Sequence, residues 1–337
     1  MRNWLGWMLM LCLMMGWMVL SAKKRLPDGY PPSPDWGFYG HRQINFLSVF
    51  LLPPEMLVFF KPNIGYLSEH AVDPDKRRYL VPDEGPRHYI DLDRYGAYPY
   101  KALPRKWQDA VNKYTEDSLK KHGIVPWHVQ VMQARLTRAF REKDASRILK
   151  YAADIGHYIA DAHVPLHTSS NHNGQYTDQK GIHGFWESRI PELLAEQSFD
   201  LLNGHAQYID DPGAFIWDRV LESAIAADSV LSIEKSLSAR YPSDRRYAFE
   251  NRNGVLVKQY SSAYTLAYHD LLNGMVERRM RQAIHSVASF WYTAWINAGQ
   301  PRLDGLAGSF SPEDSTAFKT LNEAWRSGRQ MLGRPED

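Results

Sequence analysis

The amino-acid sequence predicts an all-α protein built around one large helical domain. Apolar residues recur three and four positions apart over residues 129–140, 147–163, 215–233 and 257–296, which is the period of a helix with one buried face. The last stretch is interrupted near Gly274, where we expect a break or a kink. Strand signals are few. The 337 residues, 44% of them hydrophobic, suffice for a large core.

The stretch 257–296 also carries a row of large apolar side chains. On a helix they would share one face: Met280, Ile284, Val287, Trp291 and Trp295. Such a row is typical of core packing, and we expect these residues to be buried.

The first 22 residues have the layout of a signal peptide. Arg2 precedes an uncharged apolar run over residues 4–20, and the small residues 21–22 close it. We therefore expect an exported protein, either periplasmic or secreted. The run is nearly long enough to cross a bilayer, and three basic residues, 23–25, follow it directly. An uncleaved anchor that associates the protein with a membrane is the alternative.

Residues 23–35 are rich in proline and charge, which indicates a linker. We assign the helical domain to residues 36–300 and a C-terminal appendage to residues 301–337. In the appendage, Ser311 and Pro312 have the pattern of an N-cap followed by a first helical position, so we expect a short helix there.

Charge and cysteine content restrict the function. The 40 Lys and Arg residues nearly balance the 38 Asp and Glu residues, and the net charge of +2 gives no basic excess of the kind that indicates nucleic-acid binding. Cys12 is the only cysteine and would leave with the signal peptide. The mature protein could then form no disulfide and bind no metal through sulfur. Any metal site must use histidines, carboxylates and backbone groups.

Five candidate metal ligands are spaced regularly within residues 157–187: His157, Asp161, His167, His183 and Glu187. The first two and the last two are each four residues apart, so on a helix both side chains of a pair project from one face. Pro165 ends the predicted helix just before the middle histidine. Imidazole and carboxylate ligands without sulfur suit catalytic zinc sites, where an open position holds water. We expect His163 to support the fold or a ligand, and His172 to be a loop residue.

These residues resemble a known superfamily. The segments HYIADAHVPLH and GIHGFWE resemble the proteins that join S1/P1-type nucleases with bacterial zinc-dependent phospholipases C. Residues 36–41 (WGFYGH) are similar to the opening of the nucleases, and residues 88–91 (HYID) to their His-aromatic-Ile-Asp segment. Residues 123–127 (GIVPW) are similar to a Pro-Trp segment of the phospholipases. The resemblance covers residues 36–187 and thins over the C-terminal helices.

The resemblance implies a single all-α domain of the phospholipase C/P1 nuclease type that holds zinc ions in a cleft. One zinc would take Asp73, His88, His157 and Asp161. A second would take His167, His183 and Glu187, with Asp161 placed to bridge, and a third would take His41 and Trp36. Asp75 is the alternative to Asp73. Tyr89 would stack on a base of the substrate, and Asp91 would accept hydrogen bonds from it.

Two features depart from the family pattern. The family's mature chain begins at its tryptophan, whose amino nitrogen binds the third zinc, but residues 23–35 separate Trp36 from the predicted cleavage site. We therefore expect two zinc ions and leave the third open. Glu187 matches the phospholipases, whereas the nucleases generally have aspartate there. The motifs thus divide between the two branches.

The sequence predicts a zinc-dependent hydrolase of phosphodiester bonds. Zinc lowers the pKa of bound water to roughly 7 and so supplies hydroxide, which Asp73 or Asp161 would orient or deprotonate. The first candidate is an S1/P1-type nuclease that acts on single-stranded nucleic acid or 3′-nucleotides. A phospholipase C that hydrolyses phospholipid head groups is the alternative, and a non-catalytic helical module with structural zinc is the third. No protein partner is evident.

Overall fold

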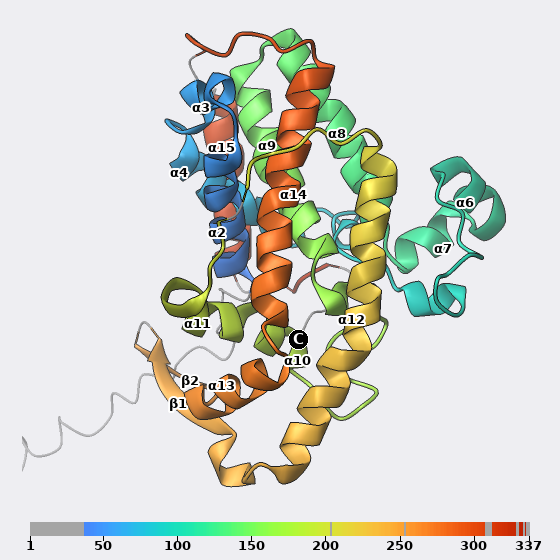
Figure 1. The fold of residues 1–337 in the computed structure, drawn as a ribbon, viewed down its shortest axis with the longest axis vertical. Helices are drawn as coiled ribbons and strands as arrows, with labels where there is room; N and C mark the ends of the chain where they lie inside the picture. The colour runs from blue at the N-terminus through green and yellow to red at the C-terminus, as the bar shows by residue number, and fades with distance from the viewer. Residues whose placement is uncertain are drawn as a thin grey trace, which may run out of the picture. The chain divides into compact units, whose positions relative to one another are not determined.

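Two long helices, α9 (Ala145–Ala162) and α14 (Met275–Asn297), pack against each other at the centre of the protein (Figure 1). Around them pack α2 (Phe38–Ser48), α8 (Val125–Glu142) and α12 (Pro212–Arg240). The computed structural model describes residues 37–202, 204–252, 254–306, 312–327, 330–332 and 334. The predicted signal peptide 1–22, the linker 23–35 and Trp36 lie outside the described residues.

Short helical elements connect and flank the long helices. Along the chain they are η1 (Val49–Leu51), α3 (Pro54–Phe60), α4 (Ile64–Glu69), η2 (His70–Val72), α5 (Asp73–Arg77), η3 (Gly85–Arg87), η4 (Leu92–Tyr95), α6 (Trp107–Tyr114), α7 (Glu116–Lys121), η5 (Pro165–Thr168), α10 (Ile182–Gly184), η6 (Phe185–Arg189), α11 (Ile190–Ser198), η7 (Ser243–Arg245), α13 (Ser262–Leu271) and α15 (Pro312–Arg326). The described chain is therefore mainly helical, as the sequence predicts.

The predicted helices are confirmed with extended bounds. Residues 129–140 lie in α8, 147–162 in α9 and 215–233 in α12. The side chain of Asp144 caps α9 by accepting from the backbone N–H of Arg147 at 3.0 Å. The predicted break occurs at Gly274, whose φ of 72° places it in the left-handed region directly before α14. The apolar row on α14 is buried, with Trp291 inaccessible to solvent.

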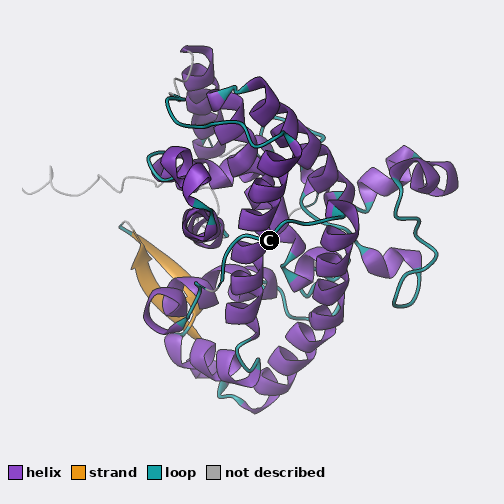
Figure 2. Ribbon diagram, turned by 45° about the horizontal axis from the view of Figure 1, so that its top comes forward, coloured by secondary structure: helices purple, strands orange, loops and turns teal. Residues whose placement is uncertain are grey.

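One expectation is wrong at residues 257–260, which form a strand rather than the start of a helix. Strands β1 (Tyr247–Arg252) and β2 (Val255–Tyr260) make an antiparallel hairpin, drawn in orange in Figure 2. Gly254 is a sequence signal for this turn, because the favoured two-residue turns need residues that tolerate positive φ. Gly254 has a φ of 85°. The turn signal therefore predicts the conformation of residues 257–260 better than the helical periodicity does.

The C-terminal appendage contains the predicted helix. α15 (Pro312–Arg326) packs against α5 (Asp73–Arg77), although the expected N-cap, Ser311, lies outside the described residues. Among the residues that the structure describes, no helix is both long and apolar enough to cross a membrane. The apolar run 4–20 is not among them.

A close helix contact depends on Gly156 in α9, directly before His157. A Cβ atom added at Gly156 would lie 2.0 Å from Oδ1 of Asn45 in α2. Asn45 is buried and donates hydrogen bonds to the carbonyls of Leu67 and Ala153, each at 3.1 Å. The side chain at this contact is therefore fixed and has no room to move aside.

We expect Gly156→Ala to lower the free energy of unfolding by about 1–3 kcal/mol, because overpacking here exceeds the gain in helix propensity. Urea unfolding monitored by circular dichroism measures the change. Gly65→Ala is the matched control, since a Cβ at Gly65 meets nothing within 4 Å. Equal stabilities of the two variants would contradict the packing argument.

Candidate metal centre

Six segments of the chain bring side chains that could bind a metal to one buried region. α2 supplies His41, α5 supplies Asp75, and His88 follows η3. α9 supplies His157 and Asp161, η5 supplies His167, and the continuous run α10–η6 supplies His183 and Glu187. The turn η6 is a π-helix, a rare conformation that occurs frequently at functional sites. Among the described residues, three groups of side chains could each hold a metal ion.

The first group comprises Asp75, His88 and His157. Nε2 of His157 lies 3.0 Å from Nδ1 of His88, and each of these nitrogens is 3.5 Å from Oδ1 of Asp75. Two donor atoms on one tetrahedral zinc, each about 2.0–2.1 Å from the ion, are about 3.3–3.4 Å apart. The spacing of the three donors therefore fits a zinc ion.

The second group comprises His167, His183 and Glu187, as the family resemblance implies. The two imidazole Nε2 atoms are 3.2 Å apart, and Oε2 of Glu187 lies 3.4 Å from His167 and 2.8 Å from His183. All three atoms face the same point, again with spacing suited to a tetrahedral ion.

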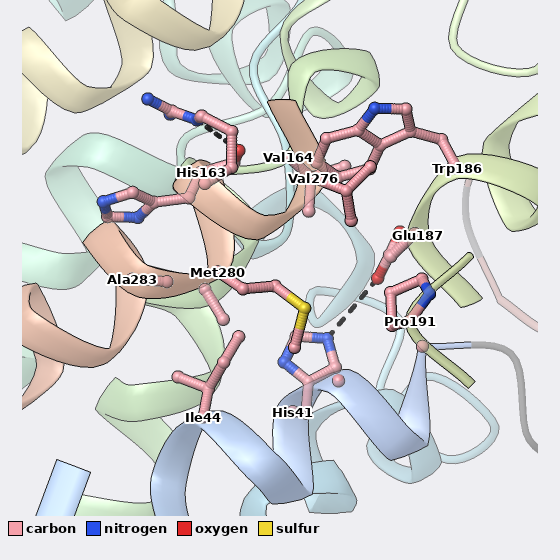
Figure 3. Close-up of a pocket in the computed structure, with 14 residues that line it drawn as sticks. His41, Ile44, His163, Val164, Trp186, Glu187, Pro191, Val276, Met280 and Ala283 are labelled. Atoms are coloured by element: carbon pink, nitrogen blue, oxygen red, sulfur yellow. Dashed lines mark hydrogen bonds and ion pairs between the residues drawn. The ribbon is translucent and has the colours of Figure 1, made fainter. Parts of the chain in front are cut away.

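The third group comprises His41, His157 and Asp161. Nε2 of His41 is 3.4 Å from Oδ1 of Asp161 and 3.6 Å from Oε1 of Glu187, and Figure 3 shows the His41 and Glu187 side chains facing each other from α2 and η6. His41 therefore lies among the other candidate ligands.

Asp161 joins the groups. Its Oδ1 faces His41, whereas its Oδ2 lies 3.0 Å from Nδ1 of His88 and 3.2 Å from Nε2 of His157. Oδ2 is buried yet has no hydrogen-bond partner in the protein. A buried carboxylate oxygen is normally satisfied. An oxygen that lies this close to ring nitrogens of two imidazoles, with the lone pair of His157 Nε2 among them, is the arrangement expected of ligands that share a cation.

Backbone carbonyls orient three of the histidines. Nδ1 of His157 donates to the carbonyl of Ala71 at 2.8 Å, Nδ1 of His167 to that of His88 at 2.6 Å, and Nδ1 of His183 to that of His172 at 3.3 Å. A proton on Nδ1 leaves the lone pair on Nε2, the atom that faces the candidate site. The loop residue His172 thus supports a ligand through its backbone.

Glu84 is a supporting residue that sequence reasoning missed. It is inaccessible to solvent, and its Oε1 lies 3.7 Å from Nε2 of His88, on the side of the ring away from Asp161. Arg87 donates to Glu84 at 2.6 Å, and Tyr158 also donates to it. Carboxylates behind metal-bound histidines fix the ring and raise its basicity. The only sequence signal is the four-residue spacing from Glu84 to His88.

The electrostatics of the region favour negative carboxylates. Burial would raise the pKa of Asp161 and Glu187, but the adjacent histidines outweigh it and hold both pKa values well below their usual range. Conversely, burial would lower the pKa of His41 and His88, whereas the carboxylate of Asp161 beside them raises both. The carboxylates thus supply buried negative charge that a cation would neutralise.

The structure places Asp75, rather than Asp73, among these candidate ligands. Oδ2 of Asp73 accepts from His70 at 2.6 Å, and its Oδ1 accepts from Lys76 at 3.1 Å. Residues two apart on a helix do not share a face. Asp73 and Asp75 both lie in α5, so only one of them, Asp75, faces His88 and His157. The family resemblance favours Asp73, and the geometry favours its alternative, Asp75. The spacing to His88 alone does not reveal where the helix begins.

Asparagine substitutions separate the two aspartates. We expect Asp75→Asn to weaken zinc binding at the first group by at least about tenfold, because a neutral amide replaces an anionic ligand. Asp73→Asn is the control and should retain its zinc. Zinc content after dialysis against a weak chelator measures both. The reverse order of zinc loss would restore Asp73 as the ligand.

The expected substrate residues follow His88 directly. The backbone N–H of Ile90 donates to the carbonyl of His167 at 2.9 Å, and that of Asp91 to the carbonyl of His122 at 2.7 Å. Tyr89 and Asp91 are therefore held at the edge of the candidate site, and both are buried in this structure.

An apolar pocket lies beside His41 and Glu187 (Figure 3). Its apolar lining includes Ile44, Val164, Trp186, Val276, Met280 and Ala283. At its other end, burial and the adjacent Arg279 lower the pKa of His163 well below its usual range. Nδ1 of His163 donates to the carbonyl of Ile159 at 2.7 Å. This histidine therefore supports the fold, one of the two roles expected of it.

Comparison with protein-family models and with curated proteins finds no match to the sequence. The fold and the site define a class on their own: a mainly helical protein with buried histidine and carboxylate groups that could hold metal ions.

Proposed function

We propose that this protein is a zinc-dependent hydrolase of phosphodiester bonds. The observation that carries the proposal is the continuity of the three ligand groups. His157 belongs to two of them, and Asp161 contacts members of all three. The carboxylate of Asp161 has two oxygens and so could bridge neighbouring ions, and two close ions suit in-line displacement at phosphorus.

The chain's own residues have distinct roles in this proposal. Asp75, His88 and His157 would hold one zinc, and His167, His183 and Glu187 a second, with Asp161 between them. Bound zinc would supply hydroxide at neutral pH and positive charge for the phosphate. The side chain of Asp75 is 16% exposed, whereas that of Asp161 is 1% exposed. Asp75 is thus better placed to orient water or accept its proton, the role first expected of Asp73.

We favour a nuclease acting on single-stranded nucleic acid or 3′-nucleotides. Tyr89 offers an aromatic ring and Asp91 an anionic acceptor, both within three residues of His88. An aromatic ring accepts a base of any sequence by stacking, and a carboxylate accepts hydrogen bonds from the amino groups of a base. This pair supports the choice of a nucleobase-containing substrate.

A phospholipase C is the second candidate. The apolar pocket that adjoins His41 and Glu187 favours it, because that pocket offers hydrophobic surface beside two candidate ligands. Glu187 also matches the phospholipase pattern. A non-catalytic helical module with structural zinc is the third candidate.

Three substrates separate these candidates. The nuclease proposal expects zinc-loaded protein to degrade single-stranded DNA or RNA, with loss of activity on chelation. If the protein releases phosphocholine from phosphatidylcholine and leaves nucleic acid intact, the nuclease proposal fails and the phospholipase C takes its place. Stoichiometric zinc without either activity would indicate the module.

Export also remains a proposal, and it bears on the third ion. Trp36 could supply an amino nitrogen to the group containing His41 only if cleavage makes it the first residue. The mass of the mature protein, measured together with its zinc content, fixes the N-terminus and the number of ions in one experiment. We expect cleavage after Ala22 and two zinc ions.

A further inference from the structure

The C-terminal segment, defined as α15 with residues 330–332 and 334, reaches the edge of the candidate site. The backbone N–H of Leu332 donates to the carbonyl of Arg78 at 2.8 Å. The guanidinium of the buried Arg78 donates to the carbonyl of Arg334 at 2.5 Å. Arg78 directly follows α5, so this contact fixes the end of the segment at the C-terminal end of the helix that carries Asp75.

The side chain of Arg334 contacts both residues expected to bind substrate. Its guanidinium carbon lies 3.5 Å from the centroid of the Tyr89 ring, and its Nη1 forms an ion pair with Oδ1 of Asp91. The Arg334 side chain is only 14% exposed. Arginine and aromatic rings attract each other at this distance, and the contact is stronger where water is excluded. The planar guanidinium of Arg334, with its N–H donors, thus already occupies the part of the candidate site formed by these two residues, called here the Tyr89–Asp91 edge.

Two aromatic residues of α15 hold the segment in place. The ring of Phe318 lies 4.2 Å from that of His70, which binds Asp73. The ring of Trp325 lies 5.4 Å from that of Phe38, and Nζ of Lys76 lies 5.9 Å from the Trp325 ring. These contacts place the segment over α5 and the start of α2, two of the elements that supply candidate ligands.

We propose that the C-terminal segment is an internal ligand of the Tyr89–Asp91 edge and competes there with a base of the nucleic-acid substrate. The guanidinium and an amino-bearing base share the two properties that this edge recognises, a flat face for Tyr89 and N–H donors for Asp91. A substrate base binds only in molecules where Arg334 has withdrawn. The apparent affinity for the base is therefore the intrinsic affinity multiplied by the fraction of molecules in which Arg334 has withdrawn. The inference rests on the proposed function for the identity of the competitor, not for the contact itself.

The test measures binding of a hydrolysis-resistant ligand to the full-length, zinc-loaded protein. The probe is a single-stranded oligodeoxyadenylate with phosphorothioate linkages, followed by fluorescence anisotropy. We expect Arg334→Ala to bind the probe with a Kd roughly tenfold lower than that of the original protein. The variant lacks the partly buried cation–π contact and the ion pair with which a base must compete. Lys319→Ala removes a cation from the exposed side of the same helix and should leave the Kd unchanged.

A peptide added in trans provides a second measurement that does not depend on the stability of the variant. A synthetic peptide of residues 325–337 should compete with the probe for the Arg334→Ala protein, whereas the same peptide with alanine at position 334 should not. Equal Kd values for the original protein, Arg334→Ala and Lys319→Ala would overturn the inference, and so would weaker binding of the probe by Arg334→Ala.

Failure of this inference differs from failure of the proposed function. If no variant binds the probe but the protein releases phosphocholine from phosphatidylcholine, competition with a base is refuted and the phospholipase replaces the nuclease. If all variants bind the probe equally and degrade single-stranded DNA, the nuclease stands and the segment is not a competitor.

Discussion

Under the proposed function, replacing His157 with alanine is expected to remove zinc and hydrolytic activity together. His157 belongs to two of the three ligand groups, and its imidazole is inaccessible to solvent. Loss of an outer-shell partner of a metal site typically costs about 10–100-fold in metal affinity or activity. Loss of a direct ligand should cost more than this range. Zinc content by atomic emission, and hydrolysis of single-stranded DNA or phosphatidylcholine, measure the two effects.

The control for this variant is His285→Ala. His285 lies on α14, and its Nε2 contacts the carbonyl of His205, outside all three ligand groups. That variant should keep both zinc and activity. A His157→Ala protein with undiminished zinc and activity would refute the assignment of the metal centre.

Removal of the metal by a strong chelator is expected to lower the thermal stability markedly. Zinc that binds the native state but not the unfolded chain stabilises the native state by about 2.7 kcal/mol per site at a concentration one hundred times Kd. Two such sites would contribute about 5 kcal/mol, which corresponds to a fall in Tm of about 10 °C on chelation. Differential scanning fluorimetry with and without zinc measures the shift.

The His157→Ala protein serves as a comparison in the same experiment. Having lost most of its metal already, it should show a chelator-induced shift less than half that of the original protein. A Tm that is insensitive to chelator in the original protein, with zinc shown to be removed, would mean that the ions do not stabilise the fold.

Local spacing predicted the parts of the site that a single helix sets. His157 and Asp161 face the site together because four residues make about one helical turn. His183 and Glu187 keep the same spacing although Glu187 lies on a π-helical turn that follows α10, which the sequence pattern does not distinguish from an α-helix. The helical fold could also be predicted, because apolar residues three and four apart lie on one face of a helix and are buried together.

The parts that depend on tertiary contacts could not be predicted in this way. Whether Asp73 or Asp75 is a ligand depends on how α5 is rotated, and the contacts of Asp73 with His70 and Lys76 show that rotation. The position of Glu84 behind His88 and of Arg334 on Tyr89 also follows from packing. Arg334 is 243 residues from Asp91 along the chain, and no local pattern connects them.

The position of Asp161 between ligand groups has a consequence for samples that contain too little zinc. The first ion to bind would fix the carboxylate that the neighbouring ion also needs, so the second would bind a site whose ordering is already complete. A half-supplied preparation would then contain fully loaded and empty molecules rather than uniformly half-loaded ones. Its specific activity would rise in proportion to added zinc from the first increment, and native mass spectrometry would resolve two populations.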